Sequence, residues 1–61
     1  MGAAYGTLGQ IERAIQDFDE AIRLDPQAAD AYNNRGVAYE YLGQQELADH
    51  DFAKAKSLGV E

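Results

Sequence analysis

The sequence contains no cysteine and no tryptophan, only one proline and one histidine, and no long apolar run. Without cysteine, neither a disulfide nor a cysteine-ligated zinc ion can stabilise the fold, and one histidine cannot form a histidine cluster. No segment is apolar over the roughly 18 residues of a membrane-spanning helix, and no signal peptide is evident. A chain of 61 residues buries only about 60% of its unfolded surface. We therefore expect a chain that is unusually well packed, or oligomeric, or a piece of something longer.

Positive charge is scarce, since five lysine and arginine residues stand against eleven acidic residues and the net charge is −6. Nucleic acids and anionic lipid surfaces attract basic patches, so we expect no nucleic-acid partner and no membrane partner. With 46% hydrophobic residues, the chain has more apolar side chains than disordered segments have. A folded protein is therefore expected. Because the chain has no cysteine and shows no signal peptide or membrane-spanning segment, the cytoplasm is its expected location.

The chain contains an internal repeat. When the sequence is shifted by 34 residues, 12 of the 27 overlapping pairs are identical without a gap. The matches include Leu-Gly-Gln at 8–10 and 42–44, and Asp-Phe at 17–18 and 51–52. Self-similarity at such a period is typical of helical repeat architectures.

Apolar residues recur at helical spacing on both sides of the second Leu-Gly. One stripe runs from Tyr32 to Leu42, and another runs from Leu47 to Leu58. Leu-Gly is a helix stop, because glycine accepts the left-handed conformation that closes a helix, and Asp-Pro at 25–26 is a second kind of break. We therefore expect an all-α fold with helices at about 2–8, 11–24, 28–42 and 45–58.

The Asn-Asn-Arg-Gly segment at 33–36 has the composition of a turn. The apolar stripe nevertheless continues through it, and a turn there would leave two helices too short to be stable. A glycine inside a helix costs up to about 1 kcal/mol relative to alanine. We expect Gly36 to lie inside a helix at a point where another helix approaches closely.

This pattern resembles the tetratricopeptide repeat, a helix–turn–helix unit of the same length. The resemblance covers essentially the whole chain, and it implies a superhelical fold and a role in protein–protein interaction. The residues that match the family's helix-packing positions are Tyr5, Leu8, Gly9, Ala14, Phe18, Ala21, Pro26, Tyr32, Gly36, Tyr39, Leu42, Gly43, Ala48, Phe52 and Ala55.

Two departures from the family pattern carry further expectations. Arg35 stands where the family usually has leucine, and we expect its stem to pack while its charged head reaches water. In the second unit, Asp49 and Lys56 replace the apolar Ile15 and Ile22 of the first. Polar residues at these positions are typical of the solvated end of a repeat array.

The sequence begins inside what would be the first helix of a unit. We therefore expect a truncated unit at 1–27, with the end of a first helix and a second helix, and a nearly complete unit at 28–61. The interpretation is an excised or engineered C-terminal piece of a longer array. Two units are fewer than the roughly three that such arrays need for stability.

No catalytic or ligand-binding constellation is predicted. His50 stands between Asp49 and Asp51, but neighbouring helical residues point around the helix and do not converge. Asp-Phe-Asp at 17–19 lacks the glycine and glutamate of a calcium loop, and the glycines fit no nucleotide-binding spacing. We expect no enzyme, no cofactor and no metal.

The resemblance implies that the first helix of each unit lines a concave, peptide-binding groove. A carboxylate clamp is not expected, because this wall lacks lysine, and Asn34 alone supplies only one rung of an asparagine ladder. Tyr41 lies off the apolar stripe, as either a binding anchor or a plain surface residue. By this mapping, the candidate contacts are Asp30, Asn33, Asn34, Val37, Glu40 and Tyr41, with Ala3, Gly6 and Thr7 from the first unit.

Two functional hypotheses follow. The first is an interaction scaffold that also self-associates, as a homodimer or other homo-oligomer, because the N-terminal face lacks its neighbour. Two copies would bury this face through an isologous contact or a helix swap, with Leu-Gly-Gln at 8–10 as the hinge where a short helix fuses with its successor. The alternative is a peptide-binding adaptor groove that functions only within a longer parent array.

Overall fold

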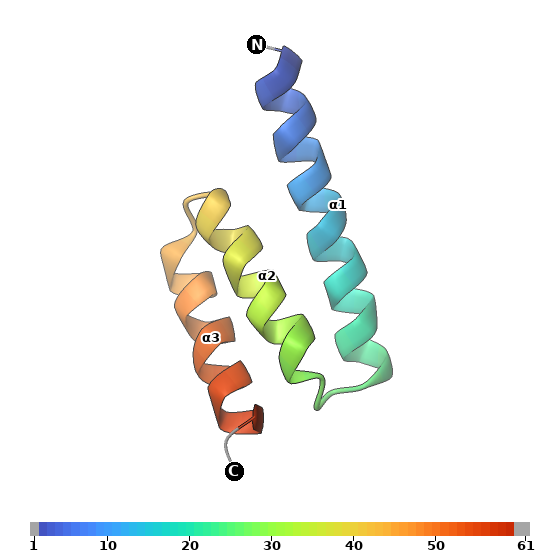
Figure 1. Cartoon of the computed structure of the whole chain (residues 1–61), viewed down its shortest axis with the longest axis vertical. Helices are drawn as coiled ribbons and strands as arrows, with labels where there is room; N and C mark the ends of the chain where they lie inside the picture. Colours follow the sequence, from blue (N-terminus) through green and yellow to red (C-terminus); the bar gives the residue numbers. More distant parts are fainter. Residues whose placement is uncertain (1, 60–61) are drawn as a thin grey trace.

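The chain folds into three α-helices in a computed structural model that describes the backbone of residues 2–59 and the side chains of residues 8–59. The helices are α1 (Gly2–Leu24), α2 (Ala29–Tyr41) and α3 (Gln45–Gly59). In Figure 1, α2 lies between α1 and α3, and the N-terminal part of α1 extends past the end of α2. No strand occurs in the described part of the chain. The predicted all-α fold is confirmed.

One boundary prediction is wrong. Separate helices were expected at about 2–8 and 11–24, whereas the structure has one continuous helix of 23 residues, α1. Continuation keeps the backbone N–H and C=O groups around residue 9 paired inside the helix. A turn would instead leave a helix of only seven residues, which is too short to be stable without strong packing.

The second Leu-Gly-Gln, at 42–44, does form the expected turn. Gly43 has a positive φ of 78°, and its N–H donates to the carbonyl of Glu40 at 3.0 Å. The N–H of Gln44 donates to the carbonyl of Tyr39 at 2.9 Å. This pair of bonds is the Schellman arrangement that closes a helix C-terminus. Identical tripeptides therefore adopt a helix at 8–10 and a turn at 42–44.

Alanine substitution at the two glycines is expected to have opposite effects. An added Cβ would meet nothing within 4 Å at Gly9 or at Gly43, so only the backbone conformation differs. Gly9→Ala should raise the free energy of unfolding by up to about 1 kcal/mol through helix propensity. Gly43→Ala should lower it by about 1–2 kcal/mol, because alanine is strained at positive φ. Urea denaturation at one protein concentration measures both, and shifts in the same direction would contradict the two conformations.

The other element boundaries match the expected ones to within one residue. The α1–α2 connection is closed by Asp25, whose carbonyl accepts the Ala28 N–H at 3.0 Å and whose Oδ1 accepts the Gln27 N–H at 3.1 Å. The Asn-Asn-Arg-Gly segment at 33–36 lies inside α2, as the apolar stripe predicted. Tertiary packing, and not local turn propensity, decides the conformation of this segment.

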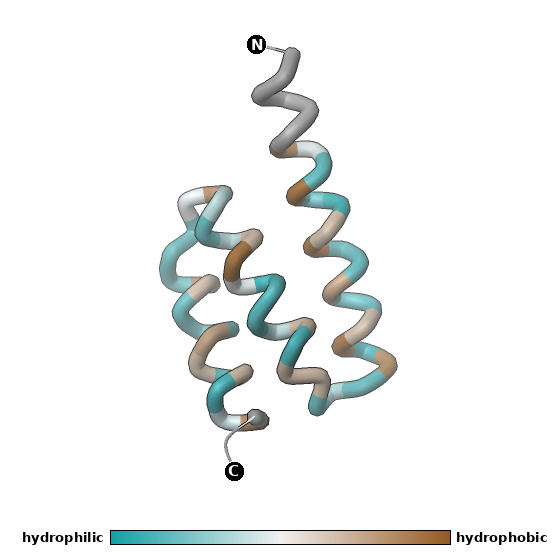
Figure 2. The backbone as a smooth tube through the Cα atoms, viewed as in Figure 1, coloured by the Kyte–Doolittle hydropathy of each residue, from teal (hydrophilic) through white to brown (hydrophobic). Residues whose placement is uncertain are grey.

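The core lies between α2 and its two neighbours and consists mainly of small side chains. Ile15 of α1, Ala31 and Ala38 of α2, and Ala48 of α3 are buried. Hydrophobic residues of α1 recur along its side toward α2 (Figure 2). A Cβ at Gly36 would lie 2.7 Å from Cε1 of Phe52 and 3.2 Å from the carbonyl oxygen of Ala48. Gly36 is therefore a point of close approach between α2 and α3, and no larger residue fits there without a shift.

Candidate functional site

The expected concave-face residues lie together on one exposed face of α2. Their spacing of three and four residues places them along a single side of the helix. Val37 is 38% exposed and Tyr41 is 72% exposed, and the other four are also exposed. Ala3, Gly6 and Thr7, which were assigned to the same wall, lie outside the residues whose side chains the structure describes. The expected residues whose side chains the structure describes therefore all lie on α2.

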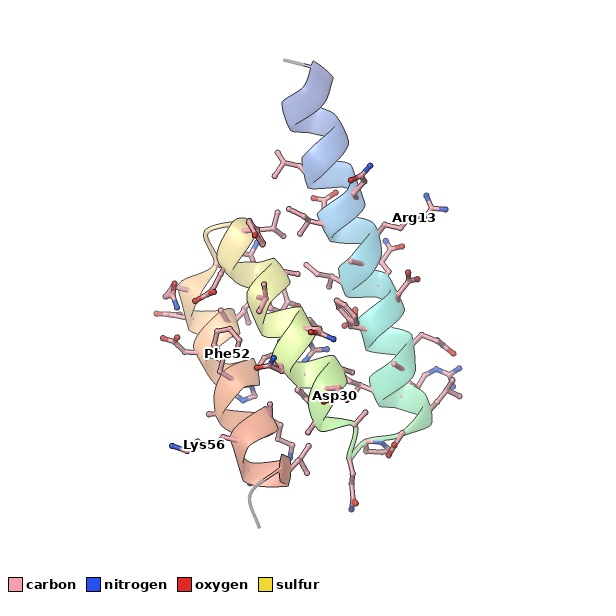
Figure 3. The ribbon with its side chains drawn as sticks, viewed as in Figure 1. Arg13, Asp30, Phe52 and Lys56 are labelled. Atoms are coloured by element: carbon pink, nitrogen blue, oxygen red, sulfur yellow. The ribbon has the colours of Figure 1, made fainter. Side chains whose placement is uncertain are left out.

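Part of this face borders a shallow hollow between α2 and α3. Asp30 and Asn33 line it from α2, while Phe52 and Lys56 line it from α3. In Figure 3, Asp30 lies in the first turn of α2 and Phe52 lies on α3, while the Lys56 side chain projects away from α2. Asn34, Val37, Glu40 and Tyr41 do not line this hollow. The sequence assigned Phe52 to helix packing and Lys56 to a solvated end, so it did not show that α3 contributes to this surface.

An ion-paired cluster joins all three helices. The guanidinium of Arg35 donates from Nε to Oδ2 of Asp51 and from Nη2 to Oδ1 of Asp51, both at 2.8 Å. Its Nη1 donates to Oδ1 of Asp19 on α1 at 2.7 Å. The guanidinium carbon lies 5.4 Å from the ring centre of Tyr32 and 5.9 Å from that of Tyr39. One side chain of α2 thus contacts an acid on each neighbouring helix.

The expectation that the head of Arg35 reaches water holds only for its Nη1 end, which pairs with the exposed Asp19. The Arg35 side chain is 19% exposed and that of Asp51 is 2% exposed, so the head is held between carboxylates. A planar guanidinium suits this two-pronged contact, because its parallel N–H groups match the two carboxylate oxygens. The hydrogen bonds to Asp51 raise the pKa of Arg35 above its ordinary value; burial opposes this shift, and Asp19 adds to it. Arg35 therefore stays charged throughout the accessible pH range.

The sequence held one signal for this cluster. Asp51 matches Asp17 in the internal repeat, and a carboxylate retained among small apolar residues on a helix face is unusual for a solvated position. The surroundings of the two carboxylates differ in the structure: Asp51 is buried, whereas Asp17 is exposed. The repeat match alone therefore did not distinguish the buried carboxylate from the exposed one, and the arginine partner could be found only from the packing of α2 against α3.

The other acidic segments form no convergent site in the described residues. His50 is exposed, while the adjacent Asp51 is turned to α2. Asp49 accepts a hydrogen bond from Nε2 of Gln45 at 2.8 Å. Within residues 8–59, no group of three or more histidine or acidic side chains is placed to hold a metal ion. No helix among the described residues combines the length and the apolarity needed to cross a membrane.

Comparison with known families places the chain in one of them. A model described as TPR repeat matches residues 2–43, and a model described as tetratricopeptide repeat matches residues 29–58. The chain belongs to the tetratricopeptide repeat family. The two matches together cover almost all of the helical part of the chain. The family resemblance seen in the sequence is therefore confirmed.

Curated relatives of this tetratricopeptide repeat chain come from distant organisms. It is 37% identical to an uncharacterised protein of Methanocaldococcus jannaschii over 98% of the chain and 67% of that protein. It is 39% identical to tetratricopeptide repeat protein 36 of Danio rerio, over 93% of the chain and 30% of that protein. It is also 39% identical to tetratricopeptide repeat protein 34 of Xenopus laevis, over 84% of the chain and 9% of that protein. No solved structure matches the chain significantly.

The chain thus spans about two thirds of the archaeal relative and less than a third of the two vertebrate ones. Tetratricopeptide repeats in general mediate protein–protein interaction, and the family is of a non-catalytic scaffold type.

Proposed function

We propose that this tetratricopeptide repeat chain is a protein–protein interaction module that associates with a second copy of itself. The observation that carries the proposal is the continuous helix α1, whose N-terminal part extends past α2 (Figure 1). In a folded repeat, that part of the chain would turn back and cover the second helix of its own unit. Here the corresponding surface of α1 is left open to another chain.

The exposure of apolar side chains supports this proposal. Leu8 is 40% exposed and Leu24 is 70% exposed, both on α1. Although Leu8 was assigned to helix packing, its side chain is partly open to solvent. A shallow hollow on α1 is lined by residues that include Ala14 and Asp17. A small chain with few buried side chains gains from covering such a surface, because apolar burial stabilises by about 25 cal/mol per Å².

The dependence of thermal stability on protein concentration tests self-association. If the folded chain associates, its melting temperature rises with concentration, because association stabilises the folded state by mass action. We expect the melting temperature to rise by several degrees between micromolar and millimolar concentrations of the chain. Circular dichroism at 222 nm measures this melting temperature. A melting temperature that is constant over this range would contradict self-association.

A second candidate function is a peptide-binding groove that works only within a longer parent array. It is favoured by the exposed face of α2, where Asn33 and Asn34 offer amide groups that suit a peptide backbone. The isolated chain should then bind peptides too weakly to detect, while a longer array that contains it binds them. Titration followed by the side-chain amide signals of the two asparagines would show this difference.

Several finer predictions extend this proposal. We propose that the chain has no catalytic activity and needs no cofactor, and that it acts in the cytoplasm. We also propose the two units at 1–27 and 28–61 as its repeat organisation, based on the 34-residue register of the sequence.

A further inference from the structure

We infer that two copies of the chain associate by exchanging their N-terminal helical segments. Residues 2–8 of each copy pack against residues 11–24 of the other, in the same way that residues 36–42 pack against α3 within one copy. This inference rests on the proposed self-association and names its geometry. It is carried by the repeat register, by the length of α1 and by the difference in burial between equivalent residues.

Both sides of the α2–α3 interface are duplicated in α1. On one side, residues 2–8 match residues 36–42, with identical Gly, Ala, Tyr and Leu residues at 2, 4, 5 and 8 and at 36, 38, 39 and 42. On the other side, Ala14 and Phe18 match Ala48 and Phe52, the residues that a Cβ at Gly36 would contact. By this register, α1 contains a counterpart of each side of the α2–α3 contact: residues 2–8 correspond to the α2 side, and residues 11–24 correspond to the α3 side.

The two halves cannot meet within one chain. A helix rises about 1.5 Å per residue, so Gly2 and Phe18 are separated by roughly 24 Å along the axis of α1. Their counterparts Gly36 and Phe52 touch, because the turn at 42–44 folds one helix back on the next. The continuous α1 therefore presents its segment and its surface at different places along the helix.

The surface on α1 is open where the equivalent surface on α3 is covered. Ala48 is 0% exposed and Asp51 is 2% exposed, whereas Ala14 is half-buried and Asp17 is exposed. A hollow lies over this part of α1, and Arg13, which helps to line it, points away from α2 in Figure 3. The face of α1 that would receive a helix is thus distinct from the face that contacts α2.

A second copy of the chain can both cover the open surface at residues 11–24 and provide a surface for residues 2–8. Each copy has one segment to donate and one surface to receive it, so two copies close a symmetric dimer with every segment placed. The hinge is also present, because Leu-Gly-Gln is helical at 8–10 and forms a turn at 42–44. Exchange of an identical element between two copies is a low-cost route to a dimer.

A proline substitution with a matched control tests this geometry. Ile11→Pro breaks the continuous helix, because proline in a helix interior removes a donor and clashes with the preceding turn. The substitution still permits a turn at 8–10. In the repeat register Ile11 corresponds to Gln45, which is the first residue of α3, and proline is tolerated at the first position of a helix. We expect Ile11→Pro to weaken dimerisation at least about 100-fold, and Gln45→Pro and Ile11→Ala to weaken it less than about tenfold.

Photo-crosslinking locates the contact even if Ile11→Pro fails to fold. A benzoylphenylalanine replaces Tyr5 in one sample and Tyr41 in a control sample, and each is mixed with chain labelled with nitrogen-15. Exchange predicts that the probe at residue 5 attaches to residues 11–24 of the labelled copy. The probe at residue 41 should not attach there, because Tyr41 lies on α2 and is 72% exposed.

The outcomes separate this inference from the self-association on which it rests. A dimer with crosslinks between residue 5 and residues 11–24 of different copies supports both. A dimer that lacks these crosslinks, or that Ile11→Pro leaves intact, overturns exchange and leaves self-association standing. A chain that sediments only as a monomer overturns both.

Discussion

Replacing Arg35 with leucine is expected to lower the free energy of unfolding by about 3–5 kcal/mol. The substitution restores the residue type that the family usually has, but it leaves the carboxylate of Asp51, which is 2% exposed, without its cationic partner. An uncompensated buried charge costs this much because water no longer solvates it. Urea denaturation, monitored by circular dichroism, measures the decrease in the free energy of unfolding. A variant too unstable to show a cooperative transition would also agree with this prediction.

Two further variants control for this effect. Arg35→Leu combined with Asp51→Leu should recover most of the loss, because replacing both members of a buried pair by apolar residues is often neutral. Arg23 pairs with Glu20 on the surface of α1, where the side chains are 68% and 55% exposed. Arg23→Leu should therefore change stability by less than about 1 kcal/mol. If Arg35→Leu is as mild as Arg23→Leu, the buried pair does not hold the three helices together.

Gly36→Ala is expected to lower the free energy of unfolding by about 2 kcal/mol, the second largest effect among the single substitutions considered. The added methyl group would lie 2.7 Å from Cε1 of Phe52 and 3.2 Å from the Ala48 carbonyl oxygen. The ring of Phe52 can shift, but the backbone of α3 can do so only by separating from α2, and such overpacking costs about 1–3 kcal/mol. The gain in helix propensity, up to about 1 kcal/mol, offsets only part of this.

The matched control for this substitution is Gly59→Ala. Its added methyl group would meet only the Cβ of Ala29, at the ordinary contact distance of 3.8 Å. We expect this variant to be neutral or slightly stabilised. Gly36→Ala with Phe52→Leu should lose less than the sum of the two single variants, because the smaller side chain frees space for the methyl group. Additive losses would show that the ring is not the obstacle.

The sequence predicted those parts of the fold that depend on the repeat itself. The register aligned the apolar stripes, and these fixed α2 and α3 and kept the turn-like segment at 33–36 inside a helix. The continuity of α1 was not predictable from local sequence, because Leu-Gly-Gln is identical at 8–10 and 42–44. Only the packing available to the flanking residues separates the helix from the turn.

The interaction surface was predicted in part. The face of α2 follows from helical spacing, so its residues could be named before the fold was known. The contribution of Phe52 and Lys56 from α3 depends on how closely the two helices approach at Gly36. Likewise, the sequence marked Arg35 as an unusual residue at a core-facing position, but its partners Asp19 and Asp51 lie 16 residues away on either side. Contacts at that separation depend on the packing of three helices, which no local pattern encodes.

Sedimentation equilibrium of the unmodified chain tests self-association most directly. The chain has a mass of 6.7 kDa, and exchange of the N-terminal segments predicts about twice this value at micromolar concentration, since two copies close the symmetric assembly. The apparent mass should fall toward that of one chain on dilution. A mass of 6.7 kDa at every concentration would contradict both the proposed self-association and the helix exchange inferred from it.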